Sequence, residues 1–177
     1  MQKKLFLLAA LLLVVILGGS QTQQNQLLSL LTQDASPPPS QTLALQDQHT
    51  YLVTKIVDGD TIQIEGGKKV RYIGINTPEL KGSQCFAKEA KERNSQLVAG
   101  KRIRLQKDVS ETDKYGRLLR FVYTEQGEFV NNLLVLEGYA LSTSYPPDIS
   151  KQTLFRKSQQ DAIQQNRGLW KAGCKTP

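Results

Sequence analysis

Alternation of apolar and polar residues predicts strands over two parts of the chain, separated by a helical pattern. β-Branched residues are frequent in these stretches, and Gly-containing turns such as Asp58-Gly59 and Gly66-Gly67 separate the first three. Five stretches fit: residues 51–57, 61–64, 69 to about 75, 101–107 and 118–123. The last two have the spacing of a hairpin whose connecting loop is long and polar.

Apolar residues at helical spacing predict three helices, at residues 83–98, 129–137 and 150–167. Ser83 is the expected N-cap of the first helix, because its hydroxyl oxygen can accept a hydrogen bond from a free backbone N–H. Gly100, Gly138 and Gly168 each follow a helical pattern and are expected to end it.

This order of elements predicts an α+β fold that is mainly β. We expect a closed five-stranded barrel of the OB type, with about three helices at its side and end. An open α+β sheet would produce a similar order of elements and remains an alternative. The expected domain spans residues 49–177, which is long enough for a single hydrophobic core.

The first 48 residues have a different composition. Residues 1–20 combine Lys3 and Lys4 with an unbroken apolar run, which predicts an export signal and a secreted, periplasmic or cell-envelope protein. The run is shorter than a comfortable membrane span, and a retained anchor that tethers the protein to a membrane is the alternative. Residues 21–48 are rich in Gln, Ser and Pro, which predicts a disordered linker.

The charge of the chain indicates which classes of partner to consider. The formal net charge is +7, and all of it lies from His49 onward. A basic domain attracts polyanions by releasing their counterions, so nucleic acid is the first partner to consider and an anionic membrane surface the second. Solubility alone is the simpler explanation of the same charge.

Two cysteines, Cys85 and Cys174, lie in the expected domain. In an oxidising compartment such a pair forms a disulfide more often than a metal or redox site, so we expect a bridge between them. Two free buried thiols are the alternative.

Three short runs carry the candidate chemistry: residues 58–61 (DGDT), 71–79 (RYIGINTPE) and 113–117 (DKYGR). They offer carboxylates and an amide for a hard cation, a further carboxylate for a water molecule, and two arginines whose planar groups match a phosphate. With a single histidine, the chain has no Ser-His-Asp or Cys-His system and no usual zinc ligand set.

Each run alone also has an ordinary structural explanation. Asp58 and Asp60 flank a glycine, and Asp-Gly is a common hairpin turn. Arg71 lies among apolar residues, where a salt bridge would satisfy it as well as a ligand would. Arg117 follows a glycine in a loop, where an arginine is usually just solvated.

The order and wording of these runs, followed by Gly-Leu-Trp near the end, resemble the staphylococcal nuclease-like (thermonuclease) family over about residues 51–171. The resemblance implies an OB-fold barrel with three helices. It also implies calcium-dependent (Ca²⁺) cleavage of DNA and RNA that leaves 3′-phosphate ends. It implies no protein partner, and we expect a monomer that meets a membrane only if the N-terminal segment is retained.

The resemblance also implies roles for individual residues. Asp60, Asn76 and Thr77 would bind calcium, Thr77 through its backbone carbonyl, and Glu79 would be the general base. The phosphate would be bound by Arg71 and Arg117. The substrate would be held by Lys114 and Tyr115, with Tyr145 in the base pocket.

Asn76 departs from the family pattern, because the best-known enzyme of the family has an aspartate there. An amide oxygen can bind a hard cation, but with less Coulomb attraction than a carboxylate. We therefore expect weaker calcium affinity or broader metal tolerance. Asn76 is also the one position that favours the alternative function, a barrel that binds nucleic acid without cutting it.

Overall fold

The computed structural model describes residues 49–174. The predicted export signal at residues 1–20 and the predicted linker at 21–48 lie outside the described residues. Between 49 and 174 no helix is both long and apolar enough to cross a membrane.

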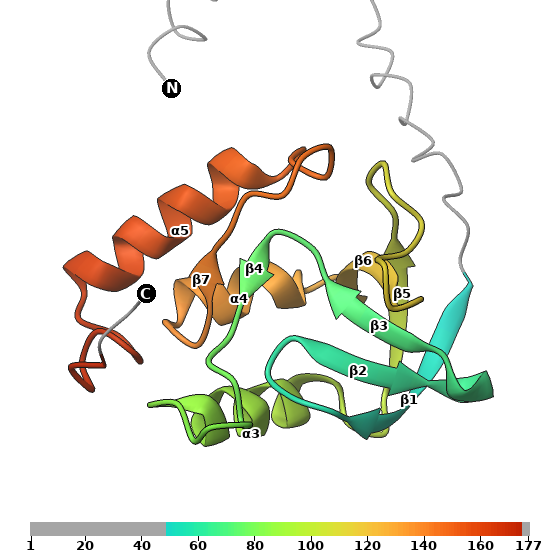
Figure 1. The fold of residues 1–177 in the computed structure, drawn as a ribbon, viewed down its shortest axis with the longest axis horizontal. Coiled ribbons are helices and arrows are strands. Elements are labelled where there is room, and N and C mark those ends of the chain that lie inside the picture. The colour runs from blue at the N-terminus through green and yellow to red at the C-terminus, as the bar shows by residue number, and fades with distance from the viewer. Residues whose placement is uncertain (1–48, 175–177) are drawn as a thin grey trace, which may run out of the picture. The chain divides into compact units, whose positions relative to one another are not determined.

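Five strands close into a barrel (Figure 1). They are β1 (Thr50–Ile56), β2 (Thr61–Ile64), β3 (Lys69–Tyr72), β5 (Arg102–Gln106) and β6 (Leu118–Thr124). Around the barrel the order is β1-β2-β3-β6-β5, and β5 pairs with β1 to complete the circle. Only β3 and β6 are parallel. The structure therefore confirms the closed barrel over the open sheet.

Inward-facing residues of every barrel strand form the core. The fully buried members include Val53, Ile62, Ile64, Val70, Ile103, Phe121 and Val122. Each such side chain contributes about 1.5–3 kcal/mol when it is removed from water. Burial alternates along β3, where Val70 and Tyr72 are buried and Lys69 is exposed, as a period-two pattern predicts, whereas β6 buries the adjacent Phe121 and Val122.

The third predicted strand ends earlier than expected. β3 stops at Tyr72, because Gly74 adopts a left-handed conformation with φ of 76° and turns the chain away from the barrel. A Cβ atom at Gly74 would lie 2.4 Å from the ring of Phe155, so glycine is required there. The chain then forms β4 (Ile75–Asn76), which pairs with β7 (Leu141–Ser142) in a separate two-stranded sheet.

Three α-helices lie beside the barrel in the described part of the chain: α3 (Ala87–Val98), α4 (Val130–Leu136) and α5 (Gln152–Gln164). In Figure 1, α4 lies between α3 and α5. A short 3₁₀ turn, η1 (Glu65–Gly67), joins β2 to β3.

Two helix boundaries differ from the prediction by three residues or more, and the others by at most two. Ser83 does not cap α3, because Ser83 and Phe86 both have positive φ and the chain between them is a turn. α5 ends at Gln164 rather than at residue 167, because Asn166 turns the chain with φ of 50°.

The last described residues pack back on α4. Leu169 is 2% exposed, and its N–H donates to the carbonyl of Gly138. A Cβ atom on Gly168 would lie 2.3 Å from the same carbonyl oxygen, so the two backbones touch directly. Beyond this contact, Cys174 forms a disulfide with Cys85, just before α3.

Candidate active site

The turn between β1 and β2 presents Asp60, which is only 4% exposed. Its Oδ2 accepts the backbone N–H of Thr77 at 2.8 Å and lies 3.1 Å from Nη2 of Arg71. The N–H of Asp60 donates to Oδ1 of Asp58. A Cβ atom on Gly59 would lie 2.7 Å from the Thr77 hydroxyl, so glycine allows this turn to approach Thr77.

Burial raises the pKa of the Asp60 carboxyl to about 6. The positive charge of Arg71 lowers this pKa and the neighbouring Asp58 raises it again. The single guanidinium therefore does not fully compensate the buried carboxylate, and an additional cation would stabilise its charged form.

Arg71 extends from β3 and is held by four acceptors. Its Nη1 donates to the carbonyls of Tyr72 at 2.7 Å and Ile75 at 3.0 Å, and its Nη2 donates to Oδ1 of Asn76 at 2.9 Å. Asp60 is the fourth acceptor. The salt bridge considered as an alternative is thus present, and the same side chain also faces a pocket.

The donors around Arg71 fit a calcium ion by type. The Asp60 carboxylate and the Asn76 amide oxygen both contact Nη2 of Arg71, so they lie close together, and Thr77 follows directly. No group of three or more His, Cys, Asp or Glu side chains gathers as a metal site in residues 49–174. A cation would therefore need amide and backbone oxygens beside the carboxylate, which is the mixed oxygen set that calcium accepts.

Glu79 follows this cluster on an exposed segment. Its backbone N–H donates to Oε1 of Gln84 at 2.8 Å. Within the described part of the chain its carboxylate has no hydrogen bond or ion pair, and the residue does not line the pocket. Glu79 thus has a solvent-accessible carboxylate whose position depends on its own backbone segment.

The loop between β5 and β6 is organised by Asp113. Its Oδ1 accepts the backbone N–H groups of Tyr115 and Arg117, and its Oδ2 accepts Nε of Arg117 at 2.6 Å. Burial would raise the pKa of Asp113, but these hydrogen bonds outweigh it and hold the pKa below the usual range. Lys114 and Arg117 both lie over the ring of Tyr115, which is 72% exposed.

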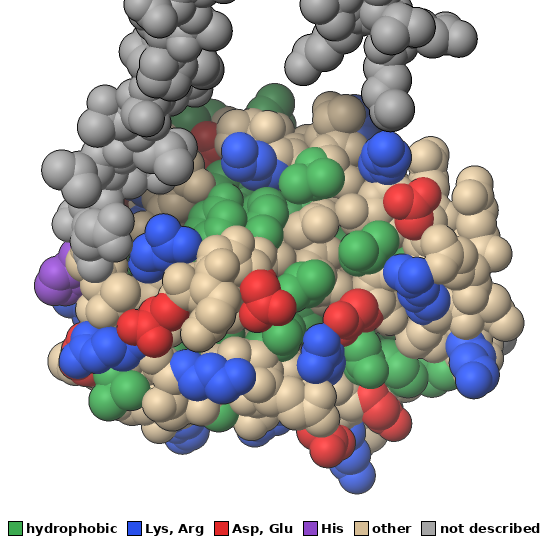
Figure 2. Space-filling model, turned by 180° about the vertical axis from the view of Figure 1, so that it is seen from behind, with side chains coloured by type: hydrophobic (Ala, Val, Ile, Leu, Met, Phe, Trp, Pro, Cys, Tyr) green, Lys and Arg blue, Asp and Glu red, His purple; other side chains and the backbone are tan. Residues whose placement is uncertain are grey.

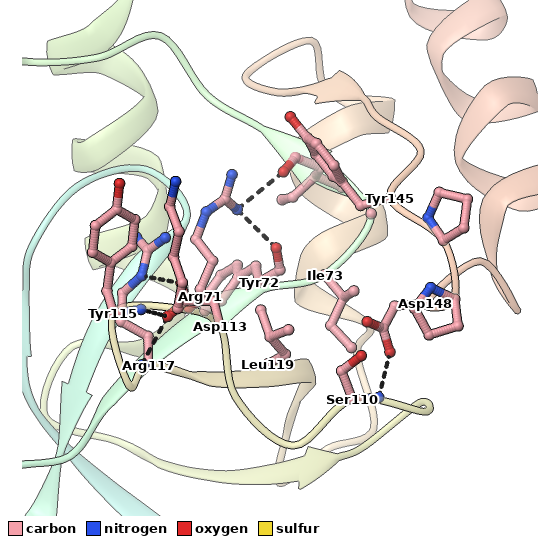
Figure 3. A pocket seen from close by; sticks show the side chains of 15 residues that line it. Arg71, Tyr72, Ile73, Ser110, Asp113, Tyr115, Arg117, Leu119, Tyr145 and Asp148 are labelled. Carbon is pink, nitrogen blue, oxygen red and sulfur yellow. Dashed lines mark hydrogen bonds and ion pairs between the residues drawn. The ribbon is translucent and has the colours of Figure 1, made fainter.

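One pocket of about 580 Å³ brings five of the predicted site residues together: Arg71, Lys114, Tyr115, Arg117 and Tyr145. In Figure 3, Arg71 lies between the Tyr115–Arg117 side and Tyr145. The other four, Asp60, Asn76, Thr77 and Glu79, lie outside the lining, and Asp60 and Asn76 reach it through their contacts with Arg71.

Asp148, which was not predicted from the sequence, joins its own loop after Tyr145 to the loop between β5 and β6 at the pocket. Oδ1 of Asp148 accepts the N–H groups of Val109 at 2.9 Å and Ser110 at 2.8 Å, as Figure 3 shows for Ser110. Asp108 accepts the N–H of Ser150 in return. An aspartate directly after two prolines was the available signal, because that residue type often binds backbone N–H groups in turns.

A second group that was not predicted, Tyr72 with Asn94, forms hydrogen bonds that support the Asp58–Asp60 turn. The hydroxyl of Tyr72 donates to Oδ1 of Asn94 at 2.9 Å, and Nδ2 of Asn94 donates to the carbonyl of Asp58 at 3.1 Å. Asn94 is completely buried on α3. An asparagine among the apolar positions of a helix is a weak sign of such a role, because buried amides need partners.

Basic and acidic side chains are interspersed over the face that Figure 2 shows. On the described surface seen there, no single positive patch dominates. On this face a polyanion would therefore meet local features rather than one basic patch. The pocket offers two arginines, Arg71 and Arg117, whose planar groups match a phosphate.

The sequence of the chain is similar to a family of nucleases and to several known members. The family described as "Staphylococcal nuclease homologue" matches residues 69–172. The thermonuclease of Staphylococcus hyicus is 32% identical over 144 residues, which cover 77% of this chain and 85% of that protein. The thermonuclease of Staphylococcus intermedius is 34% identical, covering 68% and 76%, and endonuclease YncB of Bacillus subtilis is 37% identical, covering 66% and 59%.

Proposed function

The chain belongs to the staphylococcal nuclease family, and on that premise we propose that it is an exported, calcium-dependent enzyme that cleaves DNA and RNA. Its relatives are named thermonuclease and endonuclease, so the chain is a nuclease that hydrolyses its nucleic acid substrate. The metal, the products and the location belong to the proposal.

The observation that carries the proposal is the meeting of Arg71 and Arg117 in one pocket. They come from β3 and from the loop before β6, and each is oriented by a carboxylate, Asp60 and Asp113 respectively. Guanidinium groups bind phosphate oxygens with two parallel hydrogen bonds. Two of them in a single pocket can bind one phosphodiester and stabilise the extra charge of its transition state.

In the proposed mechanism Glu79 accepts a proton from the attacking water as the water oxygen bonds to phosphorus. The opposite bond, from phosphorus to the 5′-oxygen, breaks, and the 5′-oxygen leaves with a proton from solvent. The exposed, unpaired carboxylate of Glu79 suits this role, because no other group competes for it in the described residues. Arg71 and Arg117 bind the phosphoryl oxygens and stabilise the negative charge as it grows. Tyr115 and Tyr145 expose flat rings at the pocket, on which bases can stack.

Asp60, Asn76 and the backbone carbonyl of Thr77 would hold the calcium ion. When bound, this ion supplies positive charge that polarises the phosphoryl group. Because Asn76 is neutral, the three ligands carry one formal negative charge, from Asp60. We therefore propose a weaker calcium affinity than two carboxylates would give.

The proposed products are 3′-phosphate ends, as the family resemblance implies. Two features support export: the apolar N-terminal run of the sequence and the Cys85–Cys174 disulfide, a bond that persists in oxidising compartments.

The test is hydrolysis of single-stranded DNA and of RNA by the whole chain, with calcium titrated against a chelator. We expect cutting that requires calcium, is lost in Glu79→Gln and is retained in Glu125→Gln. Glu125 is the matched control, because it is another exposed glutamate and has no partner among residues 49–174. Binding that fades with salt, ignores calcium and is never followed by cutting would instead support a binding module.

A further inference from the structure

The segment from Glu79 to Cys85, called here the Glu79 loop, is folded on itself. The N–H of Glu79 donates to the side chain of Gln84, and the N–H of Gln84 donates back to the carbonyl of Glu79 at 3.2 Å. Gly82 and Ser83 have positive φ, so the chain reverses between these two bonds. The position of Glu79 is therefore coupled to Gln84, which directly precedes Cys85.

Cys85 is covalently joined to a part of the chain that is firmly seated. Cys174, its partner, donates its N–H to the carbonyl of Leu169, which is buried against the end of α4. The direct backbone contact between Gly138 and Gly168 leaves this C-terminal segment little room to move. A continuous connection thus runs from α4 through the disulfide to Gln84 and Glu79.

The phosphate-binding groups do not share this connection. Arg71 lies on β3, Arg117 is held by Asp113, and the pocket lining contains no residue of the Glu79 loop. Phe86 stacks on Tyr139 at 5.3 Å between ring centroids, so the start of α3 keeps a noncovalent anchor when the disulfide is open.

We propose that the Cys85–Cys174 disulfide positions Glu79 for catalysis and that its reduction lowers turnover without weakening substrate binding. The inference rests on the proposed function, in which Glu79 is the base. If the disulfide acts in this way, the nuclease is most active in an oxidising compartment and slower in a reducing one.

The switching step is thiol–disulfide exchange with a dithiol. One thiolate of the reductant attacks a sulfur of the bridge, and its second thiolate resolves the mixed disulfide. The protein bond gains two electrons and two protons and becomes two thiols, while the dithiol becomes a disulfide. Reoxidation by a disulfide of the compartment reverses the step.

The first test compares kcat and KM of the whole chain before and after treatment with dithiothreitol, with calcium in excess. A positioned general base contributes about 10²–10⁴-fold to the rate, and we expect reduction to lower kcat by about tenfold with KM unchanged. The double variant Cys85→Ala/Cys174→Ala should match the reduced protein and should not respond to dithiothreitol. If kcat is unchanged, or if KM and the folded fraction by circular dichroism change together with it, the proposal is wrong.

A second variant tests the connection itself. Gln84→Ala removes the side chain that accepts the N–H of Glu79 and leaves the disulfide in place. We expect a lower kcat and a smaller further loss on reduction, because both changes act on the same element. Gln160→Ala is the matched control, since Gln160 is exposed on α5 and has no partner in the described part of the chain. Full additivity of Gln84→Ala and reduction would contradict the proposal.

A third measurement does not depend on activity. Amide hydrogen exchange should accelerate on reduction within residues 79–86 and stay unchanged within 113–117. If the oxidised protein does not cut nucleic acid but shows this exchange pattern, the proposed function fails while the mechanical link holds. If the oxidised protein cuts and the exchange does not change, the link fails and the proposed function stands.

Discussion

The two arginines of the pocket, Arg71 and Arg117, are fixed by side-chain hydrogen bonds, whereas the Glu79 side chain is not. Arg71 has four acceptors, and Arg117 is held by both oxygens of Asp113. The Glu79 carboxylate has no partner within residues 49–174. Its segment is restrained by hydrogen bonds between the backbone of Glu79 and both the side chain and the N–H of Gln84, and by the Cys85–Cys174 disulfide.

The difference fits the proposed roles, phosphate binding for Arg71 and Arg117 and general base for Glu79. An arginine that binds phosphate loses affinity if its planar group must be ordered at each binding event, so prior hydrogen bonds lower that cost. A base must present a carboxylate that is free to accept a proton, so its position has to come from the backbone. The two regions should therefore respond differently to substitution.

The largest effect is expected from Glu79→Gln. The loss of a general base should lower kcat by about 10²–10⁴-fold. Because the side chain is exposed and unpaired, the free energy of unfolding should change by less than about 0.5 kcal/mol. Steady-state kinetics and urea unfolding measure the two quantities. A large loss of stability would show that Glu79 has a structural partner in solution.

Arg71→Lys should lower both kcat/KM and the free energy of unfolding. An ammonium group keeps the charge but cannot reach all four acceptors or bind phosphate through two parallel bonds, so kcat/KM should fall by about 10²–10³-fold. Unpaired buried acceptors should also lower the free energy of unfolding by about 1–3 kcal/mol. Arg156→Lys is the control, because Arg156 is exposed on α5. Full stability with low activity would mean that the arginine contacts do not support the fold.

Asp113→Asn should weaken the hold on Arg117 and raise KM by about tenfold, the value of a charge-assisted pair of about 1.4 kcal/mol. The pKa of Asp113 is below its ordinary 3.8, so its stabilising contribution is present above that pH and is lost as the pH falls below it. The difference in unfolding free energy between wild type and Asp113→Asn should therefore be larger at neutral pH than in acid. Equal differences at both pH values would contradict the assignment.

Asn76→Asp should have the smallest effect and should change only the affinity for calcium. A second carboxylate beside Asp60 should tighten calcium binding by about three- to tenfold, since Arg71 offsets part of the added charge. Isothermal calorimetry on the whole chain measures the affinity without substrate. An unchanged dissociation constant would show that residue 76 serves Arg71 rather than the ion.

Much of the fold could be predicted from local patterns. The five barrel strands and three helices follow from periodicity, because a side chain's burial repeats every two residues in a strand and about every 3.6 in a helix. Periodicity did not separate a closed barrel from an open sheet, and it did not predict the short strands β4 and β7. Boundaries were less accurate. The patterns did not reveal the break at Gly74 or the turn at Ser83, because a ring from α5 and the positive φ of Ser83 and Phe86 decided them.

The site divides in the same way. Short runs of the sequence were enough to select Arg71, Glu79 and Arg117 as candidates, because together these runs resemble the family's motifs. The acceptors around Arg71 were not predictable, and neither was the support of the Asp58 turn by Asn94, 36 residues away. Each depends on contacts between elements that are far apart in the sequence, and no local pattern indicates which of their side chains meet.

The sequence by itself determined the fold class, the family and the residue types of the chemistry, since these depend on periodicity and on short motifs. Only the tertiary structure decided which side chains contact one another. It placed Arg71 between Asp60 and Asn76, left the Glu79 carboxylate unpaired in the described part, and joined Cys85 to Cys174 across 89 residues. The physical reason is that burial repeats locally along a chain, whereas pairing requires distant segments to meet in three dimensions.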